Sequence, residues 1–219
     1  MPNAAATQVR ERPILFSGPM VRAILDRRKT QTRRVIVDRA KDEDGWITTC
    51  PGEGFTPELV RRDFACPYGD PGDRLWVRET WASVPATAYR CSVEEDGSQV
   101  AHKESPDGYG WAIYRAGWTH CAPSWKPSIH MPRWASRLTL EITDVRVERV
   151  QSITDDDAWD EGCADFVGEP IDAGERWILP REAPRDEYRR LWDKLNAKRG
   201  YGWDANPWVW ALTFMVVPQ

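Results

Sequence analysis

Residues 26–34 read Asp-Arg-Arg-Lys-Thr-Gln-Thr-Arg-Arg, and the chain continues directly into the apolar run Val35-Ile36-Val37. This basic segment packs four arginines and one lysine into nine residues, which is unusual for a connection. Thr30 and Thr32 are two residues apart, so a strand here would point both hydroxyls to one face. We therefore predict a strand whose apolar end enters the core and whose basic start lines a polar pocket at the mouth of a small β-barrel.

The composition predicts a globular chain that does not rely on overall charge to bind its partners. Its 219 residues are enough for one large domain, and 41% hydrophobic residues are enough for a packed core. The formal net charge of −4 argues against non-specific duplex binding, which depends mainly on phosphate neutralisation, but it leaves room for a local basic groove. The 13 tryptophans far exceed ordinary usage, and indole rings stack on bases and sugars as well as filling cores.

Cysteine usage and hydropathy indicate a cytoplasmic protein without a membrane partner. The first nine residues are polar and lack the apolar run of a signal peptide. No stretch approaches the roughly 20 apolar residues that a membrane span needs. Five cysteines, an odd number without regular spacing, fit a reducing compartment, and a zinc site would want four ligands at tighter spacing. We expect no metal and no cofactor.

The N-terminal third predicts a strand, a helix and then mostly irregular chain. Residues 13–16 form a short apolar strand, and Ser17 or Gly18 caps a helix that has Pro19 at its first position. The buried stripe of this helix is expected to be Met20, Val21, Ile24 and Leu25. Residues 38–72 are expected to be mostly irregular, apart from a short locally paired strand over residues 46–49.

A strand over residues 72–81 carries a carboxylate on its apolar face. Leu75, Val77 and Trp81 share that face with Glu79, which must therefore be paired or have a raised pKa. Glu79 either meets an arginine in a structural salt bridge or faces the same pocket as the basic segment. The sequence leaves both interpretations open.

Residues 84–128 are interpreted as an insertion, with a turn at residues 94–98, a strand at 111–114 and an aromatic lid or flap. His130 follows it, either as a satisfied core histidine or as a hydrogen-bonding group for a ligand. A long strand is predicted over residues 138–150, with a bulge near Thr143 that restores its register.

The C-terminal part predicts a capped helix, an amphipathic helix and a final strand. Thr154 caps the first helix, three acids follow it, and Gly162 ends it. Glu161 therefore lies at the unfavourable end of the helix dipole, as either a solvated surface acid or a functional one. The second helix covers residues 184–198, and the final strand turns alternate residues inward: Trp208, Trp210, Leu212, Phe214 and Val216. Together these elements predict a sheet-rich α+β fold with a closed or nearly closed barrel.

Several of these segments resemble the ASCH domain of the PUA-like superfamily. They are residues 28–34, Pro71-Gly72-Asp73-Arg74-Leu75 and the helix over 154–162, in that order. Residues 66–81 and 125–149 are similar to an uncharacterised phage and prophage branch of that family, which implies a phage- or prophage-encoded protein in a bacterial host. The resemblance implies one domain over residues 1–219: a small PUA-like β-barrel with a cleft, flanking helices and an inserted loop or hairpin region at about 84–128.

The resemblance also implies a function in nucleoside or RNA chemistry. Some small bacterial members are amidohydrolases that remove the acetyl group from N4-acetylcytidine, and their active-site positions match Lys29, Thr32 and Glu161 here. In one assignment Lys29, with a pKa lowered by burial and neighbouring arginines, is the base, Thr32 positions the water or the oxyanion, and Glu161 carries the proton to the leaving nitrogen. The reverse assignment, with a charged Lys29 as electrophile and Glu161 as base, fits equally well. In an ideal strand Lys29 and Thr32 face opposite sides, so they converge only if Lys29 belongs to the preceding turn.

Two other functions remain open at the level of sequence. The protein is either a non-catalytic module for RNA, single-stranded nucleic acid or a modified base, or a ribonuclease with Lys29 stabilising phosphate and Glu161 or His130 as base. RNA is expected more than DNA, and the sequence does not indicate an oligomeric state. The expected substrate-binding residues in all cases are Arg33, Arg34, Arg78, Glu79, His130, Trp134 and Trp208.

Overall fold

The computed structural model describes residues 9–42, 45–49, 51, 54–87, 101–118, 123–163 and 184–218. The chain divides into two compact units. The first unit comprises Met1–Asp26, Tyr68–Thr143 and Phe214–Gln219, and the second comprises Arg27–Pro67 and Asp144–Thr213. The single ASCH-type domain expected over residues 1–219, with its insertion at about 84–128, stays a prediction.

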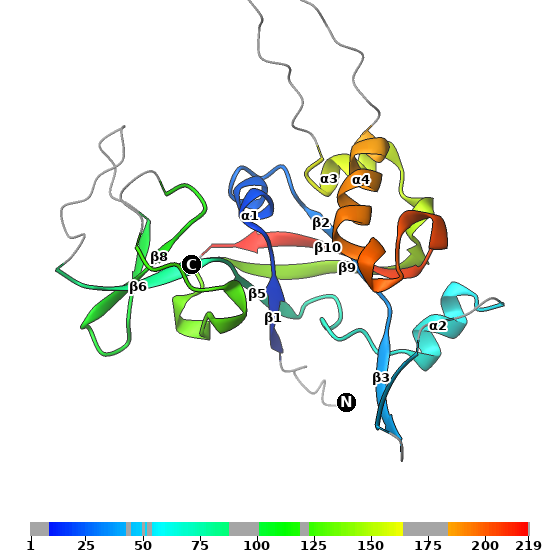
Figure 1. Ribbon diagram of the computed structural model, residues 1–219, viewed down its shortest axis with the longest axis horizontal. Helices are drawn as coiled ribbons and strands as arrows, with labels where there is room; N and C mark the ends of the chain where they lie inside the picture. Colours follow the sequence, from blue (N-terminus) through cyan, green and yellow to red (C-terminus); the bar gives the residue numbers. More distant parts are fainter. Residues whose placement is uncertain are drawn as a thin grey trace, which may run out of the picture. The chain divides into compact units, whose positions relative to one another are not determined.

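The first unit is built on the strands β1 (Glu11–Leu15), β5 (Arg74–Arg78) and the first part of β9 (Thr139–Arg149). β1 runs parallel to β5, and β5 runs antiparallel to β9 with Leu75 opposite Leu140. The helix α1 (Gly18–Leu25) follows β1, with Ser17 at its N-cap as predicted (Figure 1). Its buried face includes Val21 and Ile24, but Leu25 is exposed, because the helix ends there.

A three-stranded sheet in the order β6-β8-β7 also belongs to the first unit. β6 spans Trp81–Pro85, β7 spans His102–Glu104, and β8 spans Gly110–Tyr114, which confirms the strand predicted at 111–114. The single strand predicted over 72–81 is wrong, since β5 ends at Arg78 and β6 begins at Trp81 in a different sheet. The turn predicted at 94–98 lies outside the described residues. Two short 3-10 helices, Ser128–His130 and Arg133–Ala135, precede β9.

The second unit pairs the basic segment with the end of the chain. β2 (Gln31–Val35) runs antiparallel to β10 (Trp208–Val217), with Thr32 opposite Leu212. β3 (Asp38–Asp42) and β4 (Gly45–Thr49) form a hairpin, which confirms local pairing of the strand at 46–49. A helix, α2 (Pro57–Asp63), follows, so the expectation of mostly irregular chain over 38–72 is wrong.

Two further helices of the second unit lie side by side, α3 (Asp155–Asp160) and α4 (Pro184–Asn196) (Figure 1). Thr154 caps α3 in a reciprocal capping box with Asp157, as the sequence pattern indicates. Short 3-10 helices at Val150–Ser152, Ala197–Arg199 and Trp203–Ala205 complete the unit. Their shared core consists of Val150, Ile153, Ala158, Cys163, Tyr188, Trp192, Trp203 and Val209.

The prediction of a sheet-rich α+β fold is confirmed. The five principal strands are ordered β1-β5-β9-β10-β2, so β1 and β2 are open edges and no closed barrel is found among the described residues. The strict inward alternation expected for β10 is wrong, because Val209 and Ala211 are as buried as Trp210 and Leu212. Over the described part of the chain, no helix is long and apolar enough to cross a membrane.

Candidate functional site

The end of α3 meets the start of β2 through the backbone. The N–H of Thr30 donates to the carbonyl oxygen of Asp160 at 2.8 Å. Glu161 is the C-cap of α3, and Gly162 then takes a φ of 87°, the left-handed conformation that lets the helix end abruptly. This junction holds Lys29, which lies just before β2, beside Glu161.

Lys29 and Glu161 form a buried ion pair. The Nζ atom of Lys29 donates to Oε2 of Glu161 at 2.6 Å and to the Glu161 carbonyl oxygen at 2.8 Å. The side chain of Lys29 is 0% exposed and that of Glu161 is 4% exposed, so the pair is shielded from water. Burial lowers the pKa of Lys29 from its ordinary value, even though Glu161 opposes this shift.

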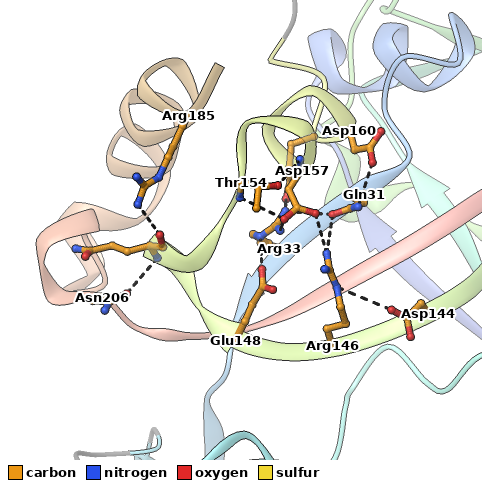
Figure 2. Close-up of polar contacts among 12 residues, drawn as sticks. Gln31, Arg33, Asp144, Arg146, Glu148, Thr154, Asp157, Asp160, Arg185 and Asn206 are labelled. Atoms are coloured by element: carbon orange, nitrogen blue, oxygen red, sulfur yellow. Dashed lines mark hydrogen bonds and ion pairs between the residues drawn. The ribbon is translucent and has the colours of Figure 1, made fainter. Parts of the chain in front are cut away.

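Arg33 extends this pair into a charged network (Figure 2). Its Nε atom donates to Glu148 at 2.7 Å and its Nη1 atom to Glu161 at 3.3 Å. Its Nη2 atom lies 3.1 Å from Oδ2 of Asp157, without hydrogen-bond alignment. Burial would lower the pKa of Arg33, but the nearby carboxylates outweigh it and the pKa is raised.

A second arginine completes the network from β9. The Nη2 atom of Arg146 donates to Oδ1 of Asp157 at 2.9 Å and to Oε1 of Gln31 at 3.2 Å. Gln31 in turn donates to Asp160 at 3.1 Å (Figure 2). Although burial opposes ionisation of Asp157, the hydrogen bond from Arg146 and the charge of Arg33 hold its pKa well below its usual range.

The side chain of Thr32 points to the opposite face of β2 from those of Gln31 and Arg33. Gln31 and Arg33 both contact the region of α3, so the alternation of β2 points Thr32 to the other face. Lys29 lies before β2, in the connection where convergence with Thr32 required it, and its ammonium donates to Glu161. Arg34 is half-buried on the Thr32 side of β2, opposite Trp210 of β10.

The expected phosphate ligands have protein partners of their own. Arg33 is surrounded by carboxylates, so it would have to leave this network to hold a phosphate. Arg78, in the first unit, donates through Nη2 to the carbonyl oxygen of Ile129, and its guanidinium lies 5.4 Å from the Trp76 ring centre.

Glu79, also in the first unit, is 1% exposed and accepts two hydrogen bonds from Arg137 at 2.8 and 3.0 Å. Burial raises its pKa despite this arginine. The pair has the geometry of the structural salt bridge that was one of the two open interpretations.

The aromatic and histidine candidates differ in exposure. His130 is exposed, which is not the environment of a core histidine. Trp134 is half-buried and packs edge-on against Trp81 with ring centres 6.0 Å apart. Trp208, in the second unit, is buried, and Arg149 lies 4.4 Å from its ring centre. Of the tryptophans proposed to stack on a base, Trp134 has the greater solvent access.

Sequence reasoning missed the residues that hold the ion pair in place. Glu148 and Arg146 were read only as part of a long strand, and Asp157 only as an acid of the first helical turn. Their signal is the run Asp144, Arg146 and Glu148, which places charges of alternating sign on one face of the predicted strand. Among the described residues no group of three potential ligands could hold a metal ion.

Comparison with known proteins adds little to this geometry. No family model and no curated protein matches the chain. The crystal structure of protein EF3133 from Enterococcus faecalis V583, whose description carries the family name DUF984, is similar with a TM-score of 0.38 and 10% identity. The similarity covers 96% of this chain and 82% of that one.

Proposed function

We propose that this protein hydrolyses an amide on a nucleoside or nucleic-acid substrate of the N4-acylcytidine type, with Lys29 and Glu161 as the proton-transfer pair. The observation that carries the proposal is the 2.6 Å contact between the Lys29 ammonium and the Glu161 carboxylate in a site shielded from water. The resemblance of residues 28–34 and 154–162 to the ASCH domain supports the choice of substrate class.

The pair has the acid and base that amide hydrolysis needs. Water adds to the acyl carbon while the neutral amine of Lys29 accepts its proton, and the ammonium so formed stabilises the oxygen that becomes negative; Glu161 then carries the proton toward the leaving nitrogen. The C–N bond then breaks, and the accepted proton passes to the departing exocyclic nitrogen, giving an amine and a carboxylate. Because burial lowers the pKa of Lys29, its neutral form is more accessible than that of a surface lysine, which suits the base.

A non-catalytic binding module is the second candidate, and the burial of the pair favours it. The ammonium of Lys29 makes two hydrogen bonds to Glu161, and that carboxylate also meets Arg33. Such satisfied buried networks commonly define a fold without reacting. Under the hydrolase proposal, by contrast, substrate must open access to the pair.

Release of cytidine from N4-acetylcytidine by purified protein tests the proposal. We expect Lys29→Ala and Glu161→Gln each to slow turnover by about 10²–10⁴-fold, the usual contribution of one acid or base. Lys194→Ala, at an exposed position of α4, is the matched control and should keep full activity. The assay is run at a temperature at which circular dichroism shows that every variant is folded. Undiminished turnover in Lys29→Ala, or none in the unmodified protein, would refute hydrolysis, and RNA binding retained in both variants would support the module.

A further inference from the structure

The outer face of β5, in the first unit, presents basic and aromatic side chains to solvent. Leu75 and Val77 of this strand point into the core and are 0% and 1% exposed. The alternate residues of the strand therefore lie on its opposite face: Arg74, Trp76 and Arg78. β1 lies beside β5 (Figure 1), and its Leu15, opposite Arg78, is 43% exposed, so this face is open. The pair of Lys29 and Glu161 belongs to the other unit.

Two guanidiniums lie against the ring of Trp76. That of Arg78 lies 5.4 Å from the ring centre, and that of Arg133, from the short helix before β9, lies 6.0 Å from it. Trp76 is only half-buried, so part of its indole contacts solvent. An indole with cations beside it can hold a nucleotide in two ways, because the ring stacks on a base and the cations bind phosphates.

The charged ends of these two arginines are not consumed by protein partners. Arg78 donates through Nη2 to the carbonyl oxygen of Ile129, in a contact at the protein surface. Arg133 donates through Nε alone to Glu11, at 2.9 Å, and its side chain is 42% exposed. Exposed ion pairs of this kind contribute little to stability, so a phosphate can replace Glu11 as the partner of Arg133 at small cost.

The charges of this face favour a polyanion. Arg74 lies 4.0 Å from Glu141, a long ion pair between half-exposed side chains, and no carboxylate among the described residues pairs with Arg78. Lys103 of β7 adds positive charge close by, since burial and the charge of Arg133 both lower its pKa. The face is therefore locally positive, although the whole chain has a net charge of −4.

We propose that the outer face of β5 binds single-stranded RNA, with one base stacked on Trp76 and phosphates held by Arg78 and Arg133. A duplex fits less well, because its bases are already stacked on one another and do not reach the indole. The choice of RNA over DNA rests on the proposed function, whereas stacking and phosphate binding rest on the face itself. Combined with the hydrolase proposal, this face makes a polymer, and not a free nucleoside, the natural substrate.

Fluorescence anisotropy with a labelled oligouridine of about ten nucleotides tests the proposal without turnover, since single-strand sites commonly cover about 4–16 nucleotides. We expect the oligouridine to bind at least tenfold more tightly than duplex RNA of the same length. Trp76→Leu should weaken binding about 5–150-fold, the effect of losing one stacked base, and Trp76→Phe should retain most of the affinity. Arg133→Gln should make the plot of log K against log salt shallower by about 0.7, the contribution of one phosphate contact on a single strand.

Arg199→Gln is the matched control. Arg199 is an exposed arginine of the second unit whose guanidinium also lies beside an aromatic ring, 5.9 Å from the centre of Tyr201. This change should alter neither the affinity nor the salt dependence. Because Arg133 and Arg199 are both exposed, neither substitution disturbs the core.

The proposal is overturned by absent binding at low salt, by an unchanged affinity of Trp76→Leu, or by equal salt dependences of Arg133→Gln and Arg199→Gln. Equal affinity for the corresponding single-stranded DNA would overturn RNA as the partner. Hydrolysis of N4-acetylcytidine without RNA binding would remove this face and keep the hydrolase function. RNA binding that follows these expectations without hydrolysis would do the reverse.

Discussion

Replacement of Glu161 by glutamine is expected to destabilise the protein strongly, because it removes one member of a buried ion pair. Breaking such a pair costs about 3–5 kcal/mol, since the remaining charge is left buried. Lys29 keeps its 2.8 Å hydrogen bond to the carbonyl oxygen of residue 161, and Arg33 keeps Glu148 and Asp157. Because these partners remain, we expect the free energy of unfolding to fall by about 3 kcal/mol, the lower end of that range.

The pH dependence of that loss identifies its cause. Burial lowers the pKa of Lys29 in the folded protein, so between that pKa and its unfolded value the unfolded chain binds more protons and stability rises with pH. Glutamine removes the carboxylate charge that opposes this shift, so the folded pKa of Lys29 falls further and the window extends to lower pH. The deficit of Glu161→Gln should therefore be largest near neutral pH and shrink as pH rises, when Lys29 loses its proton.

Urea unfolding followed by tryptophan fluorescence, from about pH 6 to about pH 10, measures both effects. Asp156→Asn, at an exposed position of the same helix, is the control and should cost less than about 1 kcal/mol. The double change Lys29→Met with Glu161→Leu should recover part of the loss, since an apolar pair leaves no buried charge at these two positions. A deficit no larger than that of Asp156→Asn, or one that does not change with pH, would refute this account of the pair.

Three further outcomes follow from other contacts. Arg137→Met leaves Glu79 buried without its partner, so we expect a loss of about 3–5 kcal/mol in urea unfolding that grows as pH rises through the raised pKa of Glu79 and that carboxylate ionises. Thr154→Ala removes the capping box of α3 and should cost about 1 kcal/mol in the same assay, whereas Thr154→Ser should cost much less. Burial raises the pKa of the Cys163 thiol to about 12, so peptide mapping should find it alkylated at pH 8 far more slowly than the half-buried Cys66, until denaturant removes the difference.

Local sequence signals predicted the elements whose structure depends on nearby residues. Thr154 and Gly162 define α3 through a cap and a left-handed turn, both of which need only adjacent backbone. The helix α2 was missed although Thr56 and Pro57 carry the same kind of start signal, because seven residues give too little apolar periodicity to recognise. The prediction that only alternate side chains of β10 are buried failed because both faces of this strand are covered. Coverage of the second face depends on tertiary packing, which the local sequence does not show.

The candidate site was predictable in its chemistry but not in its environment. A resemblance identified Lys29 and Glu161, and the two side chains do meet. No pattern near Glu161 indicates its burial, because that depends on the backbone contact between Thr30 and Asp160, which are 130 residues apart in the sequence. The direction of Thr32 follows from where β2 begins, and strand boundaries are the least certain part of any sequence-based assignment.

The pairing of β2 with β10 has a consequence for the growing chain on the ribosome. Residues 31–35 emerge before their partners, residues 209–213, and 173 residues separate the two segments. At about 5–20 residues per second, the intervening segment takes roughly 9–35 s to synthesise. During that interval the nascent polypeptide carries an unsatisfied strand edge with an apolar continuation, so its yield in cells should depend on chaperones that cover such edges until residues 209–213 are available.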